Sequence, residues 1–142
     1  MNSATSQRIF VWPIRVYYED TDAGGVVYHS RYLHFLERAR TECLRELGFE
    51  QDILARQEQV LFAVRRMEID FLKSAHFNAH LTVNSRILQL RRVSLTFDQD
   101  IILTADKTRL LHAQVQIACI DTIQHRPCPI PTSLLQKIHH EF

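Results

Sequence analysis

The sequence is poor in glycine, cysteine and proline. Its 142 residues include three glycines, three cysteines and four prolines. Cys43, Cys119 and Cys128 lie far apart in the sequence, and no two of them form a Cys-x-x-Cys pair. The pattern therefore indicates neither a zinc site nor a redox motif, and we expect three free thiols, as is usual in a reducing compartment.

An excess of charge of one sign and long apolar runs are also missing. The formal net charge is +1 and the basic residues are scattered, so nothing indicates the basic surface of a protein that binds nucleic acid or an anionic membrane. The apolar runs are too short for a membrane span, and MNSATSQRIF at the N-terminus lacks a signal-peptide pattern. We expect a cytoplasmic protein with no nucleic-acid partner and no stable membrane insertion.

Length and composition fit one globular domain. A chain of 142 residues, 46% of them hydrophobic, can bury a substantial core. No repeat, low-complexity tract or linker divides the sequence. We expect a single domain over residues 1–142, with its core at about 10–131 and a short C-terminal helix after it.

One long amphipathic helix is predicted in RYLHFLERARTECLRELGF, residues 31–49. Its apolar residues recur at helical spacing and form a wide stripe. They are Tyr32, Leu33, Leu36, Ala39, Cys43, Leu44 and Leu47. Gly48 follows the last of them, where a glycine in the left-handed conformation commonly ends a helix.

Most of the remaining chain alternates between apolar and polar residues, as half-buried strands do. We predict strands over residues 9–19, 66–71, 79–91, 93–103 and 111–119. The pattern is weakest in residues 79–91. A helix packed on a single curved antiparallel sheet, an α+β fold, accommodates these elements.

Several details of the strands can also be predicted. In the first strand Trp12, Ile14, Val16 and Tyr18 share one face. Pro13 indicates that this strand starts at or lies on a sheet edge, because proline cannot donate to a strand partner.

Further along, Met67, Ile69 and Phe71 should point inward after a bulge near Arg65 and Arg66. ADKT, residues 105–108, is predicted to be a hairpin turn. Thr132 or Ser133 is predicted to cap the last helix.

Two of the three glycines are adjacent, in EDTDAGGVVYH between the first strand and the long helix. Gly24 and Gly25 allow backbone conformations closed to other residues and a close approach by a ligand. The helix that follows directs its free N–H groups toward this loop, where they can stabilise an oxyanion. Asp22, a few residues upstream, could then attack an activated carbonyl or deliver water to it.

Two other interpretations of this loop stay open at the level of local chemistry. Aspartates beside glycines commonly stabilise turns by accepting backbone hydrogen bonds, so the loop could be purely structural. Asp20, Asp22, His29 and His34 could instead hold a metal ion.

The stretch YYEDTDAGGVVYHSRYLHFLERART resembles the signature of the hot-dog acyl-CoA thioesterases of the 4-hydroxybenzoyl-CoA thioesterase superfamily. That signature is roughly Asp-x-Asp-x-x-Gly-x-Val at a strand-to-helix junction, followed by an aromatic-rich helix. The sequence is most similar to the branch associated with the Tol-Pal cell-envelope system, the YbgC type. The similarity runs from about residue 10 to about residue 131.

The resemblance implies a role for each motif residue. Asp22 falls on the catalytic aspartate, which acts as nucleophile or general base. His29 occupies the position at the helix start whose backbone N–H polarises the thioester carbonyl. Asp20, Gly25 and Tyr28 match motif residues that support the site and bind substrate.

The resemblance also implies the assembly: a five-stranded antiparallel sheet wrapped around the long helix, and sheets joined edge to edge in a dimer. Active sites form at that interface, and two dimers often make a tetramer. An open edge strand is independently a reason to expect a homo-oligomer.

The expected reaction is hydrolysis of an acyl-CoA or acyl-carrier thioester, which needs no cofactor or metal because a thioester is already reactive. One alternative is a hot-dog dehydratase, although such enzymes use a histidine with an acidic residue rather than this paired aspartate motif. Another is a module that binds acyl thioesters or acyl carrier protein for the cell-envelope system without turnover.

Overall fold

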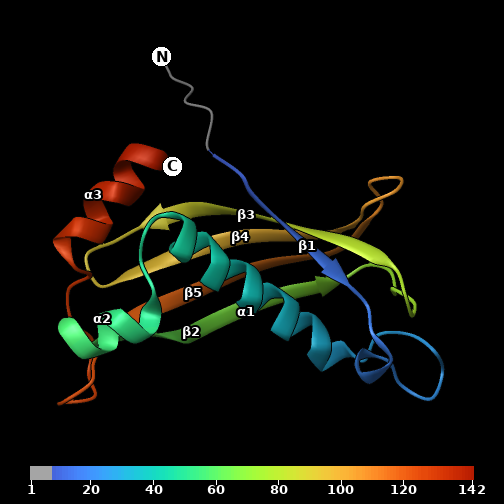
Figure 1. Cartoon of the computed structure of the whole chain (residues 1–142), viewed down its shortest axis with the longest axis horizontal. Coiled ribbons are helices and arrows are strands. Elements are labelled where there is room, and N and C mark those ends of the chain that lie inside the picture. The colour runs from blue at the N-terminus through green and yellow to red at the C-terminus, as the bar shows by residue number, and fades with distance from the viewer. Residues whose placement is uncertain (1–7) are drawn as a thin grey trace.

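A computed structural model describes residues 8–142, and it contains one antiparallel sheet with a long helix against one of its faces (Figure 1). The five strands lie in the order β1-β3-β4-β5-β2. The predicted α+β architecture is confirmed. In chain order the elements are β1 (Phe10–Arg15), a 3-10 turn η1 (Tyr18–Asp20), α1 (His29–Glu46), α2 (Gln51–Gln57), β2 (Val60–Phe71), β3 (His80–Leu90), β4 (Ser94–Leu103), β5 (Arg109–Asp121) and α3 (Thr132–Glu141).

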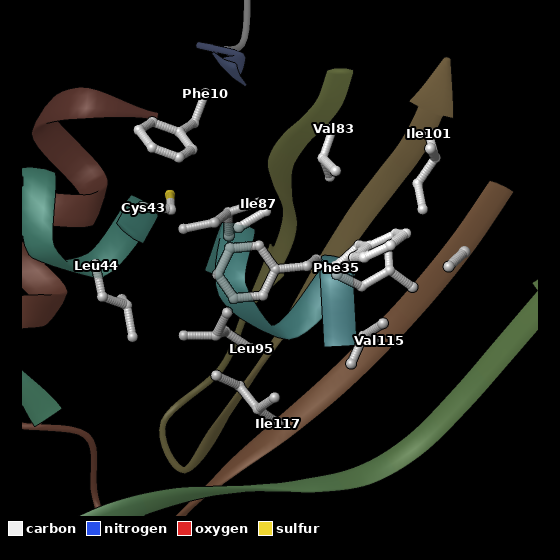
Figure 2. Packing of buried hydrophobic residues seen from close by; sticks show 14 of the residues in the cluster. Phe10, Phe35, Cys43, Leu44, Val83, Ile87, Leu95, Ile101, Val115 and Ile117 are labelled. Carbon is white, nitrogen blue, oxygen red and sulfur yellow. The ribbon is translucent and has the colours of Figure 1, made fainter. Parts of the chain in front are cut away.

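The apolar stripe of α1 packs against the inner face of the sheet. Six of its seven predicted members are buried, and Leu33 is half-buried. Phe35, which lies beside the stripe, is also buried and packs among strand residues such as Leu95 and Val115 (Figure 2). Because each fully buried large apolar side chain contributes about 1.5–3 kcal/mol, this face fixes the helix on the sheet.

The end of α1 is as predicted. Gly48 has a φ of +96°, in the left-handed region. Its N–H donates to the carbonyl of Arg45 over 2.9 Å, and the N–H of Phe49 donates to that of Leu44 over 3.0 Å. These two bonds satisfy carbonyls that the end of a helix leaves open.

The first strand is shorter than predicted. It lies at a sheet edge, as Pro13 indicates, and among the described strands it pairs only with β3. The strand ends at Arg15 rather than at residue 19, because the chain turns into η1, where the N–H of Asp20 donates to the carbonyl of Tyr17. The prediction that Tyr18 shares a strand face with Trp12, Ile14 and Val16 is therefore wrong, and Tyr18 is 76% exposed.

The opposite edge of the sheet is β2, which within residues 8–142 pairs only with β5. The predicted bulge is present between Val64 and Arg66. Met67 and Ile69 are half-buried, whereas Phe71 contacts the ring of Tyr32 but stays 52% exposed. The exposure arises because no strand in residues 8–142 covers this edge.

Of the remaining elements, some were predicted correctly and others were not. The weakly patterned segment 79–91 forms β3, with a bulge between Ile87 and Gln89, and residues 104–108 form the predicted hairpin turn. The short helix α2 was not predicted. The predicted cap of the last helix is wrong, because Pro131 is the N-cap and no side chain in the described part of the chain caps α3.

The cysteines carry free thiols, as expected. The fold brings the Sγ atoms of Cys119 and Cys128 to 3.6 Å from each other. Burial raises the pKa of Cys43 and of Cys119 to about 12, and at Cys119 the contact with Cys128 adds to the effect. Both thiols therefore stay protonated at neutral pH.

Within residues 8–142, no helix is both long and apolar enough to cross a bilayer.

A buried polar cluster ties α1 to the sheet. Gln99 of β4 is fully buried, and its Nε2 donates to the carbonyl of Leu36 over 3.1 Å and to Ser85 Oγ over 2.9 Å. Its Oε1 accepts from Arg40 Nη1 over 3.1 Å. Burial lowers the pKa of Arg40 to about 10, partly offset by the nearby charge of Glu37, so the guanidinium remains charged at neutral pH.

We expect Gln99→Leu to destabilise the fold by about 2–4 kcal/mol, because it leaves a buried guanidinium, a hydroxyl and a carbonyl without this partner. Gln114→Leu is the matched control, since Gln114 lies on β5 with its side chain exposed, and it should change stability by less than about 0.5 kcal/mol. Urea unfolding curves give both values. Equal effects of the two substitutions would show that the cluster does not stabilise the packing of α1.

Candidate active site

The loop between η1 and α1 is closed at its base by backbone hydrogen bonds. The N–H of Tyr28 donates to the carbonyl of Asp20 over 2.9 Å, and the N–H of Asp22 donates to that of Val26 over 2.9 Å. Thr21 and Val27 pair in an isolated antiparallel bridge between these bonds. The loop is therefore a small ordered hairpin that holds Asp22 close to the start of α1.

The carboxylate of Asp22 is exposed and only partly used by the turn. Its Oδ1 accepts a hydrogen bond from the N–H of Gly24 over 2.8 Å, and its main-chain carbonyl accepts from Gly25 over 3.0 Å. Within residues 8–142, Oδ2 accepts no hydrogen bond. The turn-forming hydrogen bond is thus present, and one carboxylate oxygen remains available for chemistry.

The two glycines meet different requirements. Gly25 has a φ of +81°, a conformation that residues with a side chain rarely adopt. Gly24 has no such φ, but a Cβ at this position would lie 3.3 Å from Oδ1 of Asp22. Gly25 lets the chain turn, and Gly24 leaves room for the carboxylate of Asp22.

The start of α1 provides unused hydrogen-bond donors next to this loop. The helix begins at His29 with Tyr28 as N-cap, and no side chain of residues 8–142 caps it. In the part of the chain that the structure describes, the main-chain N–H groups of His29 and Ser30 have no acceptor. The aligned peptide dipoles add a partial positive charge at the same end, so these amides can bind a carbonyl oxygen that gains negative charge.

Asp20 differs from Asp22 because its carboxylate is buried and bonded within the fold. The residue is 6% exposed, and its Oδ2 accepts from the N–H of Tyr17 over 2.8 Å. Its Oδ1 lies 3.5 Å from Nε of Arg31. Asp20 therefore holds the loop in place, and the predicted contact with substrate stays a prediction.

Tyr28 and His29, the other two motif residues, lie side by side at the helix start. Their rings are 4.4 Å apart, centre to centre, and Tyr28 is 48% exposed. Both rings are open to a ligand. The predicted role of His29 needs only its main-chain N–H.

Residues that precede β3 brace the loop in a way that sequence patterns did not reveal. The N–H of Val27 donates to the carbonyl of Ala75 over 2.9 Å, and Val26 pairs with His76. The N–H of Ala75 donates to Oη of Tyr32 over 2.9 Å. Burial raises the pKa of Tyr32, although the Ala75 N–H works in the opposite direction, so the hydroxyl is neutral.

Metal binding is not what the geometry favours. Among residues 8–142, no three His, Cys, Asp or Glu side chains gather as ligands for an ion. The suggested set of Asp20, Asp22, His29 and His34 is therefore not brought together.

Two cavities flank the base of the loop, and Asp22 lines neither of them. One, of about 640 Å³, is lined by Tyr17, Tyr18 and Phe77 among others, and the rings of Tyr18 and Phe77 stack 3.9 Å apart. The other, of about 320 Å³, includes Asp20. In the single chain Asp22 lies on an open surface.

Comparisons with known proteins agree with this arrangement. The sequence model of the thioesterase-like superfamily matches residues 16–138. The acyl-CoA thioesterase YbgC of Haemophilus influenzae is 41% identical over 131 residues, which cover 92% of this chain and 95% of that protein. The acyl-CoA thioester hydrolase YbgC of Escherichia coli O6:H1 is 44% identical over 129 residues, covering 91% and 95%.

Solved structures show the same fold. A probable thioesterase from Bartonella henselae superposes with a TM-score of 0.82 at 38% identity, covering 87% of this chain and all of the other. A 1,4-dihydroxy-2-naphthoyl-CoA thioesterase from Synechocystis superposes with a TM-score of 0.86 at 25% identity, covering 93% and 96%. The fold and the match across most of the sequence lead to one conclusion: this chain belongs to the thioesterase-like superfamily of hot-dog proteins, alongside relatives of the YbgC type.

Proposed function

We propose that this protein is an acyl-CoA thioesterase that hydrolyses an acyl thioester to a free acid and a thiol. The observation that carries the proposal is the exposed carboxylate of Asp22 on a loop next to the start of α1, where two amides have no acceptor among residues 8–142. The similarity to YbgC proteins, which are named for this activity, supports the same reaction.

In the proposed mechanism the thioester carbonyl oxygen binds to the N–H at His29. Asp22 then acts in one of two ways. As a nucleophile it attacks the carbonyl carbon, the coenzyme A thiolate leaves, and water cleaves the resulting anhydride. As a general base it removes a proton from the water that attacks the carbonyl carbon, the coenzyme A thiolate leaves, and the proton passes to that thiolate. Gly25 and Tyr28 border the bound substrate, and Asp20 supports the loop.

Asp22→Asn separates the catalytic role from the structural one. The amide keeps an oxygen that can accept from Gly24 but cannot serve as nucleophile or base, so turnover should fall at least about 100-fold while the thermal midpoint stays near that of the wild type. Asp20→Asn should reduce turnover less. The assay measures thiol release from short-chain, long-chain and aromatic acyl-CoAs.

Wild-type turnover in Asp22→Asn would mean that this loop only makes a turn. A 3-hydroxyacyl thioester tests the rival functions in the same assay. Formation of an enoyl thioester without thiol would indicate a dehydratase, and binding without either product would indicate a non-catalytic module.

Gly24→Ala tests whether the position of the carboxylate matters. The new Cβ would lie 3.3 Å from Oδ1 of Asp22, so the exposed carboxylate must shift, and we expect turnover to fall at least about tenfold with little loss of stability. Gly25→Ala is the comparison, because its φ of +81° should reduce stability by about 1 kcal/mol. Unchanged turnover in Gly24→Ala would contradict a role for the present Asp22 geometry.

We also propose that two copies join their sheets through β2, and that such dimers can pair into a tetramer. The edge strand β2 has 12 residues, and Leu61, Val64 and Phe71 on it are 40–52% exposed. The other edge strand, β1, has 6 residues and contains Pro13, which lacks an N–H donor. A second copy at β2 would also cover part of the open surface around the site.

Light scattering at micromolar concentration should therefore return at least twice the monomer mass. Val64→Lys should shift the protein toward monomer, because it places a charge on the proposed interface. Val11→Lys on the other edge strand is the matched control, since Val11 is 57% exposed, and it should leave the mass unchanged. A monomeric wild type would contradict the proposed assembly.

As part of the same proposal, the protein acts as a single domain in the cytoplasm, in association with the Tol-Pal system. The similarity to the YbgC type supports this setting.

A further inference from the structure

Arg31, in the first turn of α1, contacts the base of the site loop through Nε and Nη2 of its guanidinium group. Nη2 donates to the main-chain carbonyl of Glu19 over 3.0 Å, and Nε donates to the same oxygen over 3.2 Å. Nη2 also lies 3.1 Å from Oε2 of Glu19, and Nε lies 3.5 Å from Oδ1 of Asp20. The side chain of Arg31 is 27% exposed.

This placement goes against the usual preference for charge at a helix start. A cation in the first turn is opposed by the positive end of the helix dipole, and no acidic residue lies in the first turn of α1. The contacts of Arg31 run instead to residues before the helix. The guanidinium therefore joins the start of α1 to the segment that leads into the loop.

The contacts of Arg31 lead directly to the proposed catalytic groups. The carbonyl of Asp20 accepts from the N–H of Tyr28, the residue before His29, and Asp22 follows Asp20 by two residues. A shift of residues 19–20 would therefore move the Asp22 carboxylate relative to the amides of α1. Two donors on one carbonyl oxygen fix a direction that a single ammonium group cannot fix.

We propose that Arg31 is a positioning residue for this reaction: it holds the Asp22 loop against the start of α1 without touching substrate. The inference rests on the proposed thioesterase function. A misplacement of about 1 Å can lower a rate about 100-fold, so a side chain that only sets the base of this loop can strongly affect turnover.

The test compares Arg31→Gln with Arg45→Gln in the thiol-release assay. Arg45 lies near the other end of α1 and also contacts two glutamates, Glu42 and Glu50. We expect Arg31→Gln to lower kcat at least about tenfold and to change KM by less than about threefold. Arg45→Gln should keep kcat within about twofold of the wild type.

Arg31→Lys keeps the charge but loses the forked geometry, and we expect it to recover part of the lost kcat. If Arg31→Gln does not fold, Arg31→Lys alone decides, and full activity in it would overturn the proposal. A raised KM with unchanged kcat in Arg31→Gln would also overturn it, because Arg31 would then bind substrate directly.

Amide hydrogen exchange separates this inference from the proposed function. The N–H of Tyr28 should exchange faster in Arg31→Gln than in the wild type, and at the wild-type rate in Arg45→Gln. An unchanged rate in Arg31→Gln would overturn the positioning role. A wild type that releases no thiol from any acyl-CoA, but shows the expected exchange, would contradict the thioesterase proposal and leave the positioning of the loop supported.

Discussion

The burial of one face of α1 against the sheet is the constraint on which the rest of the structure depends. Apolar side chains from Tyr32 to Leu47 anchor the helix, and the cluster around Gln99 fixes it further through hydrogen bonds. Because the helix is fixed, its first turn gives the preceding loop a fixed point of attachment. The hydrogen bond from Tyr28 to Asp20 then sets where that loop lies.

The structural and the proposed catalytic role of Asp22 use different oxygen atoms of its carboxylate. Oδ1 accepts from Gly24 and orders the turn, while Oδ2 accepts no hydrogen bond within residues 8–142. The order that the turn imposes is also what a proposed nucleophile or base requires, because a freely rotating carboxylate would rarely meet the carbonyl correctly. The two carboxylate oxygens of Asp20 do not divide the roles in this way, since Asp20 is buried and its carboxylate is bonded within the fold.

Features with a local cause could be predicted from the sequence. The stripe of α1, the left-handed Gly48 and the edge position marked by Pro13 each follow from neighbouring residues. The position of Tyr18 was predicted wrongly because the apolar–polar alternation of the sequence continues beyond the end of the strand. The hydrogen bonds between Asp20 and Tyr17 turn the chain there. Contacts between distant residues, such as that of Ala75 with Tyr32, have no periodic signal and could not be predicted.

The central claim is that the amides at the start of α1 polarise a thioester carbonyl held beside Asp22. Infrared difference spectroscopy tests it most directly, with Asp22→Asn bound to the acyl-CoA that the wild type hydrolyses fastest, ¹³C-labelled at the thioester carbonyl. Hydrogen bonds from these amides should shift the labelled carbonyl stretch to lower wavenumber than in water. A bound carbonyl that absorbs at or above its wavenumber in water would contradict the claim.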